Sequence, residues 1–317
     1  MLSRSARRRA TASTARASRV RLGVLLTVLL LTASVGAAQF AGRGGQGGRG
    51  GRGGGGGRGG GGGRGGRGGG GGRGGFSQGA VFATSGDFDG GFQFCRIVFR
   101  NDGNGDGNGW SVDWPRADEN LSIRLSELTR VPVSMDGDKQ PKHLLVRLTD
   151  PELSRCPFVM MTEPGGAFFD DQEAVGLRNY LLKGGFLWAD DFWGEYAWSF
   201  WENQLRKVLP AAAYPIVDVP LDHPIFHEMM SVSSIPQIPS IGFWEGQRST
   251  SERGQDSAVP HVRAIDDDRG RIMVLMTHNT DFGDAYEREG DDPEYFQRFS
   301  IPGYAFGINV VLYSMTH

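Results

Sequence analysis

The most regular spacing of apolar and polar positions in the chain predicts a helix followed by a buried strand. Ala174, Leu177 and Leu181 recur at intervals that form one apolar face of a helix. Asp170 and Glu173 precede that face with the three-residue spacing of a capping box. The double glycine in the sequence LLKGGF supplies the residue type that ends helices. We therefore expect a capped helix that ends at this double glycine.

The residues after the double glycine predict a strand and the place of a functional site. Phe186–Ala189 is a short apolar run, which is typical of a strand covered on both faces. Asp190, Asp191 and Trp193 follow where this strand should end. In open α/β sheets, ligands bind at the carboxyl ends of the strands. We therefore expect these polar residues to belong to a site.

Similar runs predict one α/β domain over residues 76–317. Strands alternate with helices, which is typical of a three-layer, mostly parallel, doubly wound sheet. Val259–Asp266 and Arg271–Met276 flank a turn and predict a hairpin at one edge. Residues 220–258 show little periodicity and predict a long ordered segment over the site. The other expected strands are Phe94–Arg100, His143–Leu148, Phe158–Thr162, Pro215–Val219 and Ile272–Thr277, and the expected helices are Asp118–Thr129, Asp171–Lys183, Glu195–Leu209 and Ala305–Thr316.

The N-terminal part has the composition of an export signal and a tether. Residues 1–21 carry seven Arg and no acid, and Leu22–Thr32 is an apolar run of 11. This order predicts a signal peptide over residues 1–38, and an uncleaved membrane anchor is the alternative. Residues 39–75 are rich in Gly and Arg and predict a disordered linker. We expect an exported protein of the periplasm or cell envelope, with no transmembrane helix after cleavage.

Charge separates the two parts of the chain and limits the partners. The chain has 34 Lys and Arg against 36 Asp and Glu, and residues 1–75 hold 14 of the Arg and no acid. Residues 76–317 therefore have 20 basic and 36 acidic residues, a formal charge of −16. A domain this acidic is a poor candidate for binding nucleic acid. We expect its partner to be a small polar ligand or an envelope protein.

The two cysteines, Cys95 and Cys156, each stand at the start of a predicted strand. If these strands are neighbours in the sheet, both thiols lie at its amino edge. An exported protein permits a disulfide. A Cys95–Cys156 bridge and two buried free thiols are both open, and neither cysteine lies where a nucleophile is expected.

Polar residues after several predicted strands could perform acid–base chemistry. Asp190, Asp191 and His278 could act as general acids and bases in a hydrolase. Asp281 and Asp284 follow His278 with a loose spacing that could also hold a divalent cation. Neighbouring residues of an extended chain point to opposite sides, so one of the two adjacent acids could instead cap the next helix.

The same edge of the predicted sheet could form a binding surface without catalysis. Trp114, Arg116 and Trp193 combine aromatic faces with polar groups, which suits a sugar or a peptide. Asn279 and Asp281 follow the last strand and could contribute further polar groups. Turns favour polar residues in any case, but that preference does not account for the tryptophans.

A third candidate is a calcium loop. Asp102, Asn104 and Asp106 alternate ahead of a glycine, and Asp113 stands at the twelfth position, which is the spacing of an EF-hand loop. The loop follows a strand rather than a helix, and its last position is Asp rather than Glu. Calcium is therefore a candidate ligand, and a Gly- and Asn-rich turn is the alternative.

Several segments resemble a known bacterial family, the domain of unknown function numbered 4159. They are GWSVDWPRADENLSIRLSELT, MMTEPGGAFF, LRNYLLKGGFLWADDFWG, YPIVDVPLDHPIF and MTHNTDFGD, and the resemblance covers nearly all of residues 93–317. That family is similar to the class I glutamine amidotransferase-like superfamily. The resemblance implies a flavodoxin-like sheet, and it does not imply a reaction.

The resemblance also implies what chemistry is missing. Amidotransferase-like enzymes place a cysteine at the turn after a central strand, where this chain has Asp190 and Asp191. Glu163, Gly165 and Gly166 resemble the loop whose backbone N–H groups hold an oxyanion in such folds. The resemblance therefore implies a non-catalytic binding domain. A carboxylate- or metal-dependent hydrolase is the alternative.

Overall fold

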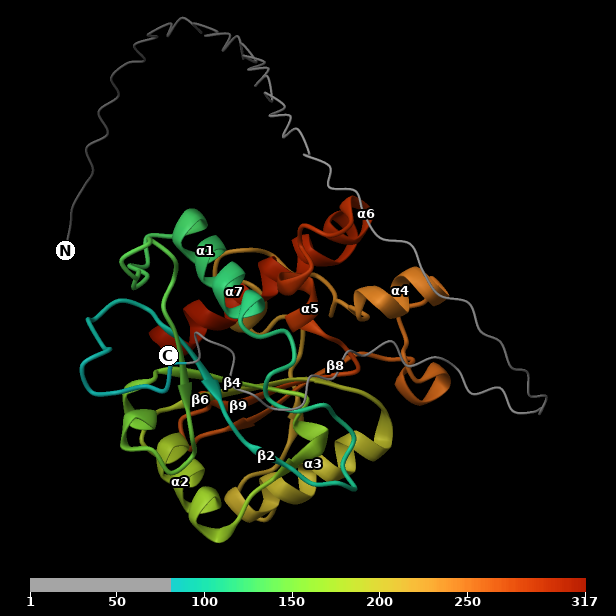
Figure 1. The fold of residues 1–317 in the computed structure, drawn as a ribbon. Helices are drawn as coiled ribbons and strands as arrows, with labels where there is room; N and C mark the ends of the chain where they lie inside the picture. The colour runs from blue at the N-terminus through green and yellow to red at the C-terminus, as the bar shows by residue number, and fades with distance from the viewer. Residues whose placement is uncertain (1–80) are drawn as a thin grey trace, which may run out of the picture. The chain divides into compact units, whose positions relative to one another are not determined.

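The computed structural model describes residues 81–317, so the predicted signal peptide and Gly/Arg-rich linker lie outside the described residues. The described chain is built around a seven-stranded sheet (Figure 1). Across the sheet the strands are β3 (His143–Val146), β1 (Phe94–Ile97), β4 (Phe158–Thr162), β6 (Phe186–Phe192), β9 (Ile272–His278), β8 (His261–Asp266) and β7 (Val217–Asp218). Strand β8 is antiparallel to both its neighbours, and the other six strands share one direction.

Helices cover both faces of this sheet. They are α1 (Arg116–Leu128), α2 (Asp171–Leu182), α3 (Gly194–Val208), α4 (Ile241–Gln247), α5 (Phe282–Glu287), α6 (Pro293–Tyr295) and α7 (Ile301–Thr316). Helices α1, α5 and α7 lie on one face, and α2 and α3 lie on the other (Figure 1). Two apolar clusters fill the space between the sheet and these helices. Trp188 packs into the cluster under α1, α5 and α7, and its neighbour Leu187 packs into the cluster under α2 and α3, because successive strand residues point to opposite faces.

The predicted α/β domain with a mostly parallel sheet is confirmed. Every expected strand and helix is present at least in part. The predicted hairpin is formed by β8 and β9, and β7 pairs on its outer side. A small ribbon of β2 (Arg100–Asn101) and β5 (Ala167–Phe168) lies outside the main sheet. The short helices α4, α5 and α6 were not expected from the sequence.

Strand β6 is longer than the sequence predicts. Asp190 and Asp191 lie inside the strand, which continues to Phe192, and they do not form a turn after it. A bulge interrupts the pairing with β9 between Ala189 and Phe192, and Asp191 adopts a left-handed conformation with φ 59°. The strand can carry Asp190 into the interior because hydrogen bonds satisfy its carboxylate.

The question left open for the two cysteines has a definite answer. Strands β1 and β4 are neighbours, and Cys95 and Cys156 form a disulfide with Cα atoms 6.2 Å apart. Both residues are buried near the amino ends of their strands. The disulfide therefore lies toward the opposite end of the strands from the carboxyl edge, where ligands bind in such sheets.

The capping box predicted at the start of α2 is also confirmed. The carboxylate of Asp170 accepts hydrogen bonds from the backbone N–H groups of Gln172 and Glu173, both at 3.0 Å. The side chain of Glu173 in return accepts from the Asp170 N–H at 2.9 Å. This pair satisfies N–H groups that a helix start otherwise leaves without partners.

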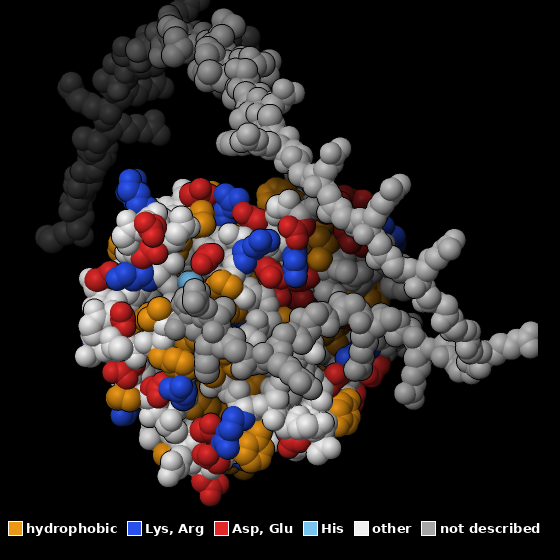
Figure 2. Space-filling view, in the orientation of Figure 1, with side chains coloured by type: hydrophobic (Ala, Val, Ile, Leu, Met, Phe, Trp, Pro, Cys, Tyr) orange, Lys and Arg blue, Asp and Glu red, His pale blue; other side chains and the backbone are white. Residues whose placement is uncertain are grey.

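The surface of the described part carries both signs of charge. On the face shown in Figure 2, acidic and basic side chains lie next to one another. Exposed ion pairs such as Arg248–Glu294 and Arg100–Asp170 contribute to this mixture. Within residues 81–317, none of the helices combines the length and the apolar character that crossing a bilayer demands.

Candidate functional site

Acidic side chains gather where four neighbouring parallel strands, β1, β4, β6 and β9, reach their carboxyl ends. They come from the loop after β1, from the end of β6 and from the start of α5. All of them are buried, although a buried carboxylate is costly unless it is paired or protonated. We call this group the carboxylate cluster, and its members are Asp113, Asp190, Asp191, Asp281 and Asp284.

Asp190 fastens strand β6 to the start of α5. One carboxylate oxygen accepts from the hydroxyl of Thr277. The other accepts from the backbone N–H groups of Phe282 at 2.9 Å and Gly283 at 3.1 Å. Burial raises the pKa of Asp190 to about 7, and these hydrogen bonds oppose the rise. Asp190 therefore has a structural role, and its carboxyl group titrates near neutral pH.

Asp191 lies at the bulge beside Trp193. The Trp193 indole N–H donates to a carboxylate oxygen of Asp191 at 2.9 Å, and both side chains are buried. The prediction that Trp193 offers an aromatic face to a ligand at the surface is therefore wrong, because the side chain is buried. Burial raises the pKa of Asp191 well above its usual range, and the charges of Glu163 and Asp113 add to that effect.

The structure separates His278 from Asp190. The His278 ring lies against Phe192 and Trp198, with ring centres 5.0 and 5.2 Å apart, on the face covered by α3. Asp190 instead bonds Thr277 and the start of α5, on the other face. The Nε2 atom of His278 lies 3.0 Å from the carbonyl oxygen of Gly194, which can only accept, so Nε2 carries the proton. Burial lowers the pKa of His278 to about 4.

The start of α3 is capped by residues from elsewhere, so the expectation that Asp190 or Asp191 caps it is wrong. The Asn279 side chain accepts from the N–H of Gly194 at 2.8 Å. Asp256 accepts from the N–H of Glu195 at 3.2 Å. Asn279 also donates to the carbonyl of Val259 at 2.8 Å, so both ends of its amide group hold backbone. Neither acid of β6 is free to reach the helix start, because both have other partners.

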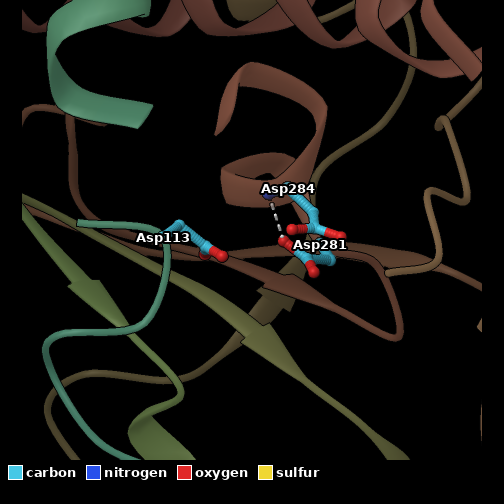
Figure 3. A group of neighbouring side chains, drawn as sticks. All are labelled: Asp113, Asp281 and Asp284. Atoms are coloured by element: carbon cyan, nitrogen blue, oxygen red, sulfur yellow. Dashed lines mark hydrogen bonds between the residues drawn. The ribbon is translucent and has the colours of Figure 1, made fainter. Parts of the chain in front are cut away.

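Three members of the cluster form a tighter group. One oxygen from each of Asp113, Asp281 and Asp284 lies within 4.8 Å of the others (Figure 3). Asp281 accepts from the N–H of Asp284 at 2.7 Å and so caps α5. Burial raises the pKa of Asp113 and Asp281 well above their usual range. Burial also raises the pKa of Asp284 to about 6.

The fully buried Arg96 on β1 holds the loop that carries Asp113. Its guanidinium donates to both oxygens of Asp118 and to the hydroxyl of Thr162 at 2.6 Å. It also donates to the carbonyls of Trp110 at 3.2 Å and Val112 at 3.1 Å. These bonds fix the backbone immediately before Asp113, which has φ 61°. Non-glycine residues seldom adopt that conformation, and such strain is common at functional sites.

Glu163 and the two glycines after it connect this edge to the loop after β1. The Glu163 carboxylate accepts from the backbone N–H groups of Asn108 and Gly109. The N–H of Gly166 bonds the carbonyl of Glu163 at 3.3 Å, and the carbonyl of Gly165 accepts from the N–H of Asp106 at 3.0 Å. Both glycines are buried. The segment that resembles an oxyanion loop is therefore packed against the loop after β1 and hydrogen-bonded to it.

The predicted calcium ligands Asp102, Asp106 and Asp113 do not come together in the structure. Asp102 accepts from the N–H of Asn104 at 2.9 Å, which forms a local turn. Asp106 makes an exposed ion pair with Arg253 at 2.9 Å. Asp113 joins Asp281 and Asp284, and neither Asp102 nor Asp106 belongs to that group.

The two remaining predicted ligand-binding residues lie near α1. Arg116 is exposed, and its guanidinium is 3.7 Å from the carboxylate of Asp291. Trp114 is half-buried between Trp110 and His143, with ring centres 5.7 and 5.8 Å away. Within residues 81–317, neither side chain is hydrogen-bonded to the carboxylate cluster.

Sequence reasoning missed Arg96 and its partner Asp118. A signal was available, because Arg96 interrupts an otherwise apolar strand in the sequence FCRIVF. A charged residue is rarely fully buried unless it is paired. This position therefore indicated a buried ion pair, although the identity of its partner depends on the fold.

Comparison with known proteins places the chain in a family. A search of curated proteins found none that matches it. A family model, described as a domain of unknown function (DUF4159), matches residues 96–315. That range contains every residue of the carboxylate cluster and covers more than half of the chain. The protein therefore belongs to the DUF4159 family of domains of unknown function.

Proposed function

We propose that this protein is an exported domain with the three-layer, doubly wound sheet of the class I glutamine amidotransferase-like, flavodoxin-like superfamily. Six strands of one direction with helices on both faces support that fold. The charged and apolar N-terminal pattern supports export to the periplasm or cell envelope. The Cys95–Cys156 disulfide supports an oxidising compartment.

The proposed role is to bind a polar ligand, a glycan or an envelope partner at the carboxyl edge without catalysis. One observation carries this proposal: buried carboxylates occupy the edge, and both cysteines are engaged in a disulfide elsewhere. The amidotransferase mechanism requires a thiolate nucleophile, which this chain cannot supply. Carboxylates instead accept hydrogen bonds and attract cationic groups, so they favour a ligand rich in hydroxyl or amino groups.

A thermal-shift screen of the full chain against amino acids, sugars and cell-wall fragments tests this role. A ligand at about 100 times its Kd adds about 2.7 kcal/mol of stability, which raises the Tm by a few degrees. The shift should disappear in Asp191→Asn and persist in the exposed control Asp222→Asn. Glutaminase turnover by the wild type that is lost in Asp191→Asn would contradict the proposal.

A carboxylate- or metal-dependent hydrolase is the second candidate, and the backbone of Asp191 favours it. The left-handed conformation at the bulge is a strained arrangement of the kind found at catalytic turns. Asp190 could exchange a proton near neutral pH. His278 is not available to Asp190, because the two lie on opposite faces. Hydrolysis of an ester, peptide or glycoside that is lost in Asp191→Asn but kept in His278→Gln would favour this candidate over binding alone.

A further inference from the structure

Asp113, Asp281 and Asp284 bring three carboxylates within cation-binding reach. One oxygen of each lies within 4.8 Å of the others, and all three side chains are buried. In Figure 3 the carboxylate of Asp113 points toward the other two across the gap between its loop and α5. Acidic groups also occur together without an ion, so the inference depends on how each oxygen is satisfied.

Asp113 has an oxygen that nothing in the described chain satisfies. The residue is 7% exposed, and its Oδ2 atom has no hydrogen-bond partner within residues 81–317. By contrast, Asp281 accepts from the N–H of Asp284 at 2.7 Å, and Asp284 accepts from the N–H of Ile241 at 2.6 Å. A buried polar atom without a partner is rare in folded proteins and destabilising. The Asp113 oxygen is therefore available to a ligand.

Within the described region, Asp284 is the only member of this group with a directly bonded basic side chain. Within residues 81–317, neither Asp113 nor Asp281 forms an ion pair. The nearby Arg96 is already bonded to Asp118. Arg288 lies 3.4 Å from Asp284, but it is shared with Glu287 and Asp291. Asp113 and Asp281 therefore have no bonded basic partner at the place where the three carboxyl groups converge.

We propose that Asp113, Asp281 and Asp284 together bind one hard divalent cation, Ca²⁺ or Mg²⁺. Both ions prefer carboxylate oxygens, whereas the zinc sites of proteins usually include His or Cys, which this group lacks. The inference deepens the proposed function and rests on it, because it assigns a cation to the same edge. The bound ion would link the loop after β1 to the start of α5.

Gly283 is the residue that lets Asp113 approach this group. A Cβ atom at position 283 would lie 2.1 Å from Oδ2 of Asp113. Any residue larger than glycine at position 283 would therefore require the Asp113 carboxylate to move. The absence of a Cβ therefore gives Asp113 the space to reach toward Asp281 and Asp284.

Calorimetric titration of CaCl₂ and MgCl₂ into the chelator-treated full chain tests the proposal. We expect one ion per chain, and binding weakened at least tenfold in Asp113→Asn and in Asp281→Asn. Asp102→Asn is the matched control, because it removes an acid of the same loop that lies outside the group. Loss of binding in Asp102→Asn with wild-type binding in Asp113→Asn would overturn the inference.

A second variant protects the test against a folding defect. If Asp113→Asn does not fold, Gly283→Ala replaces it in the test. This variant keeps every carboxylate and displaces only that of Asp113, so it should also weaken cation binding at least tenfold. No heat and no Tm shift with either ion in the wild type would overturn the inference. Ligand binding without metal binding would leave the proposed function standing, and metal binding without any ligand would support this site alone.

Discussion

Two buried groups of charged side chains lie at the same edge of the sheet and differ in how their charge is neutralised. Arg96 and Asp118 are both fully buried and bonded to each other. Asp113, Asp281 and Asp284 are also buried, but within residues 81–317 only Asp284 has a basic partner, Arg288. Both groups lose their hydration on folding, and only in the first is every member paired directly with an opposite charge.

The difference separates a structural role from a binding role. Arg96 directs its Nη1 group to Thr162 and to two backbone carbonyls, so its contacts beyond Asp118 also hold the fold together. Among the three aspartates, one oxygen of Asp113 has no hydrogen-bond partner in the described chain, and neither Asp113 nor Asp281 forms an ion pair there. A buried group that is complete within the chain stabilises the fold, whereas one that is incomplete indicates a missing partner.

The largest expected effect comes from breaking the complete group. Arg96→Met leaves Asp118 buried without its partner and should lower the free energy of unfolding by about 3–5 kcal/mol, measured by urea denaturation. The double variant Arg96→Met/Asp118→Leu removes both charges and should recover most of that loss. A loss below 1 kcal/mol in the single variant would show that this pair does not hold the edge together.

The next effect concerns pH and Asp190. Burial raises the pKa of Asp190 to about 7, against 3.8 for an ordinary carboxyl group. Between these values the folded protein keeps the proton and the unfolded chain releases it, so stability falls as pH rises. The shift corresponds to about 4 kcal/mol. Urea denaturation in chelator at pH 5 and pH 7 should show a smaller fall for Asp190→Asn than for the wild type, and equal falls would contradict the assignment.

A smaller effect should follow from crowding the incomplete group. In Gly283→Ala, the new Cβ would overlap the Asp113 carboxylate, so the side chain must move. We expect a loss of about 1–3 kcal/mol in the free energy of unfolding. Gly290→Ala is the control, because a Cβ at that position meets no atom within 4 Å. Equal stability of the two variants would show that Asp113 moves away freely.

The smallest effect is expected for an exposed ion pair. Arg253 and Asp106 have side chains that are 45% and 30% exposed. Because solvent screens such pairs, Arg253→Ala should change the free energy of unfolding by less than about 1 kcal/mol. A loss as large as that of Arg96→Met would mean that the loop after β1 is held mainly from its outer side.

The sequence predicts the elements well where local signals agree. The capping box of Asp170 and Glu173, the apolar spacing after it and the double glycine all indicate the same helix, and the structure confirms it. The disulfide could be stated only as one of two alternatives, because it depends on which strands are neighbours. Local patterns thus predict elements, and pairings between distant segments require the fold.

The site is less accessible to sequence reasoning for the same reason. Asp190 and Asp191 were expected in a turn, because an acid inside a buried strand is costly unless distant groups satisfy it. For Asp190 those groups are Thr277 and the start of α5, which lie far away in the sequence. The EF-hand spacing grouped Asp113 with Asp102 and Asp106, whereas the structure places Asp113 beside Asp281 and Asp284, which follow β9.

The most direct test of the central claim is the stability of Asp113→Asn relative to the wild type, measured by urea denaturation with and without a divalent cation. In chelator, the variant should be the more stable protein, because it removes one of several buried carboxylates that repel one another. In saturating Ca²⁺ or Mg²⁺ the order should reverse, because the cation stabilises only the intact group. The same order in both conditions would contradict the claim that this edge of the sheet is built to bind.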